Sequence, residues 1–185
     1  MLHIPVSDIL ILNTYAPADA PALFNTIDKN RNYLRTWLEW VDHTKKEDQS
    51  LDFIYGAQMQ LQQQTGLVLG IFLSGVLIGG IGMHDWDHNL QKAEIGYWLD
   101  KDHQGLGIMQ NCAAAFIDYL FTRLRLNKIE IRFHPANDRS AAVAKRLGFT
   151  VEGILRDAQN RNGLLQDVVV TGLLRREWLV RKQED

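Results

Sequence analysis

The pattern of apolar positions divides the chain into helical and extended segments. A spacing of four residues after Gly107 predicts a long helix, whose apolar stripe consists of Ile108, Cys112, Ala113, Phe116, Ile117, Leu120 and Leu124. Residues 94–99, just before this helix, are apolar and aromatic and predict a strand. Residues 128–134 alternate and predict a second strand, so the whole unit favours a right-handed crossover between two parallel strands.

Further strands are predicted on both sides of this unit. Residues 67–73 and 76–83 flank Ser74-Gly75, which indicates a tight hairpin turn. Together with residues 94–99 they predict a meander of three consecutive strands. The remaining strands are expected at residues 9–15, 150–157 and 165–174, the last two joined by a turn around Asn162-Gly163.

The N-terminal third is predicted to be mostly helical. One helix begins near residues 17–21 and another covers about residues 50–64. Between them, residues 30–41 predict a helix with one face made of Tyr33, Trp37, Trp40 and Val41. That face can dock on the core or form the wall of an acceptor pocket, because such pockets are rich in aromatic side chains. Later in the chain, Asn137 can cap a helix over residues 138–147 that ends at Gly148.

Composition narrows the class of protein. The 185 residues contain no visible linker or repeat, and we expect a single domain over residues 1–185. A net charge of −2 argues against binding nucleic acid or a membrane surface through bulk positive charge. The single cysteine, Cys112, lies on the apolar stripe and is expected to be a buried core residue rather than a nucleophile. The N-terminus has no basic region followed by a long apolar run, so we expect a soluble, cytoplasmic protein.

A Gly-rich loop, residues 104–107, connects the predicted central strand to the predicted helix. Such a loop directs free backbone N–H groups and the positive end of the helix dipole at one point. A glycine-assisted tight turn is the alternative interpretation. Gln110 stands where a dinucleotide fingerprint needs its third glycine, and no Gly-Lys-Ser/Thr follows, so neither of those phosphate motifs is present. A phosphate or pyrophosphate is the expected ligand.

The loop reads Gln104-Gly-Leu-Gly107-Ile-Met109, which resembles the pyrophosphate-binding motif Gln-x-x-Gly-x-(Gly/Ala) of the GNAT N-acetyltransferase superfamily. The resemblance covers roughly residues 66–175 and is closest to the Rim-type ribosomal-protein N-acetyltransferases, through Glu94-Ile-Gly-Tyr-Trp-Leu, Asn137-x-x-Ser140 and Arg146-Leu-Gly-Phe149. It implies an α/β fold with a mixed, mostly antiparallel seven-stranded sheet, splayed at Leu99 and covered by helices on both faces. Met109 departs from the usual small residue of the motif.

The same resemblance implies acetyl-coenzyme A (acetyl-CoA) as the cosubstrate and no metal. The residues that would bind it are Trp98, Leu99, Gln104, Gly105, Leu106, Gly107, Ile108, Met109, Asn137 and Ser140. The expected acceptor is a primary amine, in the first place the N-terminal α-amine of a ribosomal protein. Two alternatives remain: a small amine (a polyamine, an amino acid or an aminoacyl conjugate) as acceptor, and an acyl-CoA-binding module without turnover. The sequence leaves the oligomeric state open, a homodimer included.

Acetyl transfer from a thioester requires a neutral amine and a proton for the departing thiolate. An α-amine has a pKa near 8, so about a tenth of it is neutral at pH 7 and a weak base suffices. Glu94 is the candidate base, because many GNAT enzymes place one on the strand before the loop; the alternative is a strand carboxylate paired with Lys92. His84 and Asp85 are expected near the same edge of the sheet, or are simply turn residues.

The proton donor for the thiolate involves the largest departure from the family pattern. A tyrosine commonly lies four residues before the glycine of Leu-Gly-Phe, and here that position is Ala144. Ser140 lies one helical turn earlier on the same face and is the candidate donor. The alternative is that Ser140 is only a first-turn helix residue. Asn137 is similarly either an N-cap or, as the resemblance implies, a residue that holds the pantetheine arm.

Overall fold

The computed structural model describes residues 2–161 and 163–184, residue 184 by its backbone only. Its centre is an eight-stranded sheet with the order β1-β2-β3-β4-β5-β6-β8-β7. The strands are β1 (His3–Pro5), β2 (Leu10–Thr14), β3 (Leu67–Leu73), β4 (Val76–Asp87), β5 (Lys92–Leu99), β6 (Lys128–Phe133), β7 (Thr150–Arg161) and β8 (Leu164–Leu174). Only β5 and β6 pair in parallel; all other neighbours are antiparallel. The mixed, mostly antiparallel sheet is confirmed, with eight strands rather than seven.

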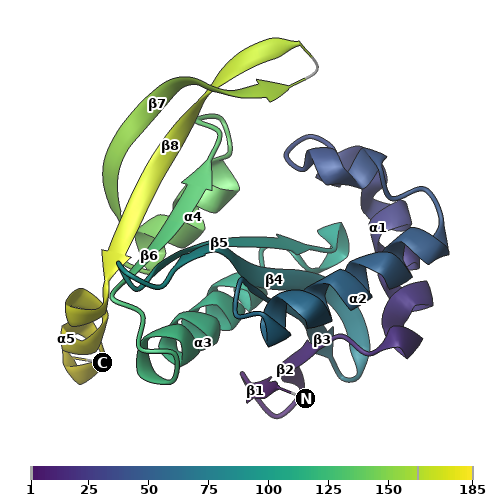
Figure 1. Cartoon of the computed structure of the whole chain (residues 1–185), viewed down its shortest axis with the longest axis horizontal. Coiled ribbons are helices and arrows are strands. Elements are labelled where there is room, and N and C mark those ends of the chain that lie inside the picture. Colours follow the sequence, from purple (N-terminus) through teal and green to yellow (C-terminus); the bar gives the residue numbers. More distant parts are fainter. Residues whose placement is uncertain (1, 162, 185) are drawn as a thin grey trace.

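Helices cover both faces of this sheet (Figure 1). They are α1 (Ala20–Leu34), α2 (Glu47–Gln62), α3 (Ile108–Thr122), α4 (Asp138–Arg146) and α5 (Arg175–Glu184), with short 3-10 turns η1 (Pro17–Asp19), η2 (Glu39–Asp42) and η3 (Lys101–His103). One apolar core lies between the sheet and α3, and Cys112 is fully buried in it, as the sequence predicted. A second, smaller core joins α1 and α2 to the opposite face.

The parallel pair β5 and β6 stays together for only three residues. Lys92, Ala93 and Glu94 face Lys128, Ile129 and Glu130, and beyond them no further pairing joins the two strands in the described part of the chain. The strands therefore part after Glu94, not at Leu99 as expected from the sequence. An opening between two strands exposes backbone groups and side chains of both faces, which makes it a natural place for a ligand.

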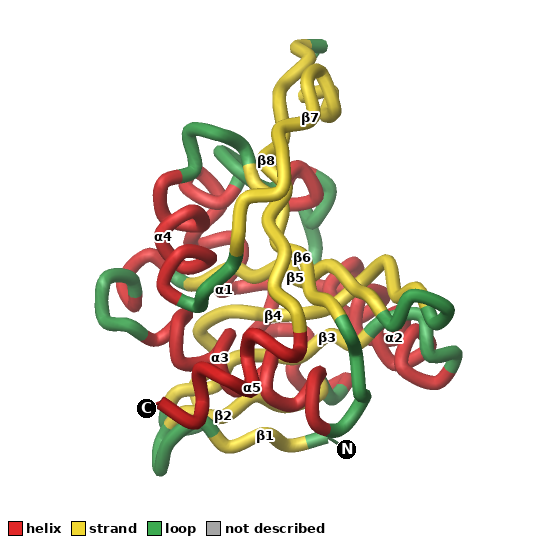
Figure 2. The backbone as a smooth tube through the Cα atoms, turned by 90° about the vertical axis from the view of Figure 1, so that its left-hand side faces the viewer, coloured by secondary structure: helices red, strands yellow, loops and turns green. Residues whose placement is uncertain are grey.

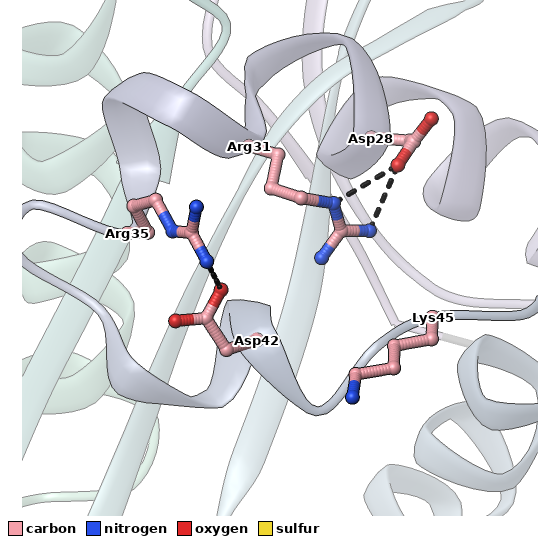
Figure 3. A pocket seen from close by; sticks show the side chains of 5 residues that line it. All are labelled: Asp28, Arg31, Arg35, Asp42 and Lys45. Atoms are coloured by element: carbon pink, nitrogen blue, oxygen red, sulfur yellow. Dashed lines mark hydrogen bonds and ion pairs between the residues drawn. The ribbon is translucent and has the colours of Figure 1, made fainter.

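The predicted helix over residues 30–41 is wrong beyond Leu34, where α1 ends. The guanidinium of Arg31 explains the change of direction, because it donates hydrogen bonds to the carbonyls of Val41 and Thr44 and pairs with Asp28 at 2.9 Å. These bonds turn the chain back on itself. The small hollow that results has a volume of about 370 Å³, and Figure 3 shows the side chains that line it, those of Asp28, Arg31, Arg35, Asp42 and Lys45. Four of its five charged side chains form two ion pairs, Arg31 with Asp28 and Arg35 with Asp42. These pairs brace the loop.

The β7–β8 hairpin extends away from the body of the molecule (Figure 2). It is longer than predicted, and Asn162 of the predicted turn lies outside the described residues. Near its tip, Arg161 donates a hydrogen bond of 2.6 Å to the carbonyl of Arg35, at the end of α1. The hairpin thus reaches across to the braced loop. Two elements escaped prediction altogether, β1 with three residues and the C-terminal helix α5.

Candidate active site

A cleft of about 910 Å³ lies where β5 and β6 part. Its walls come from segments far apart in the sequence: the end of α1, the strand β5, the Gly-rich loop, the first turns of α4, and the β7–β8 hairpin. Most residues named from the sequence therefore share one space. This cleft is the candidate active site.

The Gly-rich loop has the geometry that a bound anion requires. Gly105 and Gly107 adopt φ angles of +77° and +75°, which residues with a Cβ rarely adopt, and no described atom lies within 4 Å of where a Cβ would be. Gly107 is the N-cap of α3, and no side chain caps that helix end. The first N–H groups of α3 thus lack the partners that helix interiors provide. The side-chain oxygen of Gln104 is buried without a hydrogen-bond partner among the described residues. The open glycine backbone and the unpartnered N–H groups fit a pyrophosphate, whose oxygens accept hydrogen bonds.

Nine of the ten residues expected to bind the cosubstrate line the cleft. The exception is Leu106, whose side chain is 68% exposed and does not line the cleft. In a two-glycine loop the backbone does the binding, so the residue between the glycines can point to solvent. Met109 lies at the start of α3 and packs against the core beside the cleft.

Strand β5 presents different chemistry on its two faces. Side chains alternate along a strand, so Glu94 and Trp98 point toward α1 and α2, and Tyr97 points toward α3 and α4. The contacts agree, because Trp98 packs against the α1–α2 core and Tyr97 packs against the α3 core. The cleft therefore has one side that holds Glu94 and another that holds Tyr97.

Glu94 is paired, but not with Lys92. Its side chain is 16% exposed, lies 3.2 Å from Nε of Arg132 and 3.9 Å from Nε2 of His84. Burial raises the pKa of Glu94, the electrostatic interactions with His84 and Arg132 oppose that rise, and Asp85 and Glu130 add to it. His84 and Asp85 lie at this edge as expected. A half-buried carboxylate with a raised pKa is suited to accept a proton.

The buried carboxylate of Glu130 holds Arg132 in place. Its guanidinium donates to Glu130 at 3.0 Å, and Lys92 and Lys128 lie 3.2 and 3.0 Å from the same carboxylate. Burial raises the pKa of Glu130, but the hydrogen bonds from these cations outweigh it and lower that pKa to about 2. Because Glu94 and Glu130 are opposite each other on β5 and β6, Arg132 also separates two like charges.

Ser140 lies on the other side of the cleft. It is in the first turn of α4, and its backbone N–H donates to the side chain of Asn137 at 3.1 Å, so Asn137 is an N-cap. Its hydroxyl is 3.1 Å from the hydroxyl of Tyr97. Ala144, one turn further, is 2% exposed and offers no donor. Asn137 and Ser140 both line the cleft.

The aromatic segment after α1 contributes only partly to the site. Tyr33 and Trp37 line the cleft, and Trp37 lies against His134 with the ring centres 5.9 Å apart. Trp40 instead contacts Trp98, and Val41 is buried in the core. Sequence reasoning missed the roles of Tyr97 and Arg132 in this cleft. The alternation of charge along β6 and the tyrosine inside Glu-Ile-Gly-Tyr-Trp-Leu were the only signals that could have indicated them.

The cleft at the parting of two parallel strands, beside an uncapped, Gly-rich helix start, suits a phosphate-bearing ligand, and the comparisons identify the class of enzyme. The Acetyltransferase (GNAT) domain family matches residues 10–150. The chain belongs to this family, and it is an N-acetyltransferase of the acyltransferase class. Dependence on acetyl-CoA is typical of the family.

Individual relatives cover nearly the whole chain. "Putative ribosomal N-acetyltransferase YdaF" of Bacillus subtilis (strain 168) is 34% identical over 179 residues, which are 96% of this chain and 98% of that protein. The ribosomal-protein-serine acetyltransferase of Escherichia coli (strain K12) is 33% identical over 165 residues, 89% and 92% of the two chains. RimL, a ribosomal L7/L12 α-N-protein acetyltransferase solved with coenzyme A, superposes with a TM-score of 0.90 at 28% identity, over 94% of this chain and 98% of that one. Among the described residues, no helix is both long and apolar enough to span a membrane.

Proposed function

We propose that this protein, as a single domain, transfers acetyl from acetyl-CoA to the N-terminal α-amine of a ribosomal protein. One observation carries the proposal: a single cleft joins the uncapped Gly-rich loop to a carboxylate on one side of β5 and a serine on the other. The relatives named for ribosomal-protein acetylation support the choice of acceptor. In this proposal the enzyme acts in the cytoplasm, and neither nucleic acid nor a membrane takes part.

The roles follow from the positions of the groups. The N–H groups at the start of α3 and the backbone at Gly105 and Gly107 hold the pyrophosphate. The amine attacks the thioester carbon, a C–N bond forms, and the C–S bond breaks. Glu94 accepts the proton that the amine loses, directly or through a water. Ser140 supplies a proton to the departing sulfur, and Asn137 fixes the turn that carries it.

An α-amine suits this cleft better than a lysine side chain. A lysine has to give up roughly 4–5 kcal/mol to reach the neutral fraction that an α-amine has at pH 7. Glu94 is restrained by Arg132 at 3.2 Å, so it is a moderate base rather than a strong one. Positioning of the amine against the thioester supplies the rest of the rate acceleration, since good orientation can lower the activation barrier by roughly 7–11 kcal/mol. Tyr33 and Trp37 supply apolar walls for the acceptor's first residues.

The experiment compares matched acceptors with acetyl-CoA as donor. A lysine-free peptide with a free N-terminus is set against the same peptide with a blocked N-terminus and one internal lysine, and against spermidine and a free amino acid. We expect acetylation of the first peptide only, located at its α-amine by mass spectrometry. Turnover of spermidine or the amino acid with unmodified peptides would replace the proposal by a small-amine acetyltransferase. Calorimetric binding of acetyl-CoA without turnover of any acceptor would leave an acyl-CoA-binding module.

A further inference from the structure

The Tyr97 hydroxyl makes one hydrogen bond with described residues, to the hydroxyl of Ser140 at 3.1 Å. The two residues come from β5 and α4, 43 positions apart, and both line the cleft. The ring of Tyr97 packs against the apolar core beneath α3, which fixes the position of its hydroxyl. The contact is therefore built by the tertiary structure and joins the strand to the helix at the cofactor side of the cleft.

The acidity of the two hydroxyl groups decides which of them donates the hydrogen bond. A phenol is more acidic than an alcohol and is the better donor, whereas the alcohol oxygen of serine is the better acceptor. With Tyr97 donating, the Ser140 oxygen is held from one side and its own proton is free to point elsewhere. The backbone N–H of Ser140 is already engaged by Asn137, so the serine is fixed at both ends. The free O–H direction that remains is into the cleft.

We propose that Tyr97 is a positioning residue for Ser140: its hydroxyl donates to the serine oxygen and aims the serine proton at the leaving thiolate. This inference rests on the proposed role of Ser140 and deepens it. The pair takes the place of the family's tyrosine, which is missing because Ala144 occupies that position. The hydroxyl of Tyr97, on β5, polarises the hydroxyl of Ser140, on α4, which alone is a weak acid.

The protonation state of Tyr97 is consistent with this role. Burial raises the pKa of the Tyr97 hydroxyl to about 12, and the hydrogen bond to Ser140 opposes that rise. Tyr97 thus keeps its proton throughout the working pH range. During transfer the C–S bond breaks, the Ser140 proton moves to sulfur, and Tyr97 stabilises the serine oxygen until solvent restores its proton.

The first test is Tyr97→Phe, which deletes only the hydroxyl and keeps the packing of the ring. We expect kcat to fall roughly 10-fold, the value of one lost hydrogen bond to a polar group, with coenzyme A affinity unchanged by calorimetry. In the Ser140→Ala background the same change should cost nothing further, because Tyr97 acts through the serine. Tyr119→Phe is the matched control, since the Tyr119 hydroxyl makes no hydrogen bond with the described residues and lies outside the cleft.

A second measurement separates positioning from packing. Replacement of Tyr97 by 3,5-difluorotyrosine lowers the pKa of the phenol and barely changes its shape. We expect the alkaline limb of kcat to move to lower pH, because ionised Tyr97 can no longer donate. Wild-type kcat in Tyr97→Phe, or an alkaline limb that fluorination leaves in place, would overturn the inference while a slow Ser140→Ala variant still upholds the role of the serine. Wild-type turnover by Ser140→Ala would instead remove the proposed role of Ser140 itself.

Discussion

The two faces of β5 are lined by different chemistry. On the side toward α1 and α2, Glu94 of β5 forms a chain of ion pairs with Arg132 and the buried Glu130 of the neighbouring strand β6. On the side toward α3 and α4, the hydroxyl of Tyr97 of β5 meets the hydroxyl of Ser140 of α4 beside an apolar core. Both open into the same cleft.

The difference matches what each half of the reaction needs. An attacking amine must lose a proton, and a carboxylate whose charge is adjusted by neighbours can take it. A departing thiolate must gain a proton near an apolar surface, where a neutral donor costs less to bury than a charged one. One strand can serve both because its side chains alternate between the two faces. The predictions below test each side in turn.

The largest effect is expected on the hydroxyl side. Ser140→Ala should lower kcat roughly 100- to 10,000-fold, the usual range for general acid assistance, with coenzyme A affinity nearly intact. Alanine keeps the backbone N–H that Asn137 caps, so α4 should persist by circular dichroism. Thr122→Ala on α3 is a control that removes an exposed hydroxyl far from the cleft. Turnover of Ser140→Ala at the wild-type rate would reduce the serine to a helix-start residue.

Substitution of Glu94, on the charged side of the cleft, should lower kcat by a factor that depends on pH. Glu94→Gln should lower kcat about 100-fold at mildly acidic pH, just above the raised pKa of Glu94, and less at higher pH, where the amine loses its proton unaided. Because only the ionised carboxylate accepts a proton, and burial raises its pKa, wild-type activity should fall as pH drops through that raised pKa. A pH–rate profile of both proteins checks this. A loss of equal size at every pH would indicate a structural role for Glu94.

Neither side works without the cosubstrate, which the Gly-rich loop should hold. Gly107→Val should weaken coenzyme A binding about tenfold or more, because a β-branched residue is strained at a φ of +75° and its side chain would fill the space left for the pyrophosphate. Gly153→Val is the matched control, since Gly153 lies in β7 without a positive φ and no described atom lies within 4 Å of its Cβ position. Equal affinity in the two folded variants, measured by calorimetry, would rule out the loop assignment.

The smallest change in kcat is expected when the residue that adjusts the pKa of Glu94, Arg132, is replaced. Arg132→Met removes a positive charge that opposes the raised pKa of Glu94, so that pKa should rise further. The acid limb of kcat should move to higher pH by the same amount. Arg132→Lys keeps the charge and should keep the limb near its wild-type position. If the methionine variant retains the wild-type limb and only unfolds at lower temperature, Arg132 stabilises the fold and does not tune the base.

Local sequence patterns determined much of this architecture. The meander, the crossover and α3 were predicted because their apolar positions repeat over many residues, and α4 because Asn137 and Gly148 mark its ends. The loop, Glu94 and Ser140 were identified because a resemblance attaches meaning to short motifs. β1 escaped prediction because three residues give no period, and α5 escaped it because Trp178 is the only buried residue among the α5 side chains that the structure describes. The helix over residues 30–41 failed because Arg31 bonds to carbonyls that lie ten or more residues away.

The sequence by itself thus determined the order of the elements, the position of the Gly-rich loop and the identity of a carboxylate and a serine near it. Only the tertiary structure decided which partners those residues have. Arg132 reaches Glu94 because two parallel strands bring it there, and Tyr97 meets Ser140 across 43 positions of sequence. Such contacts depend on the register and the parting of β5 and β6, and neither is encoded in any local period of the chain.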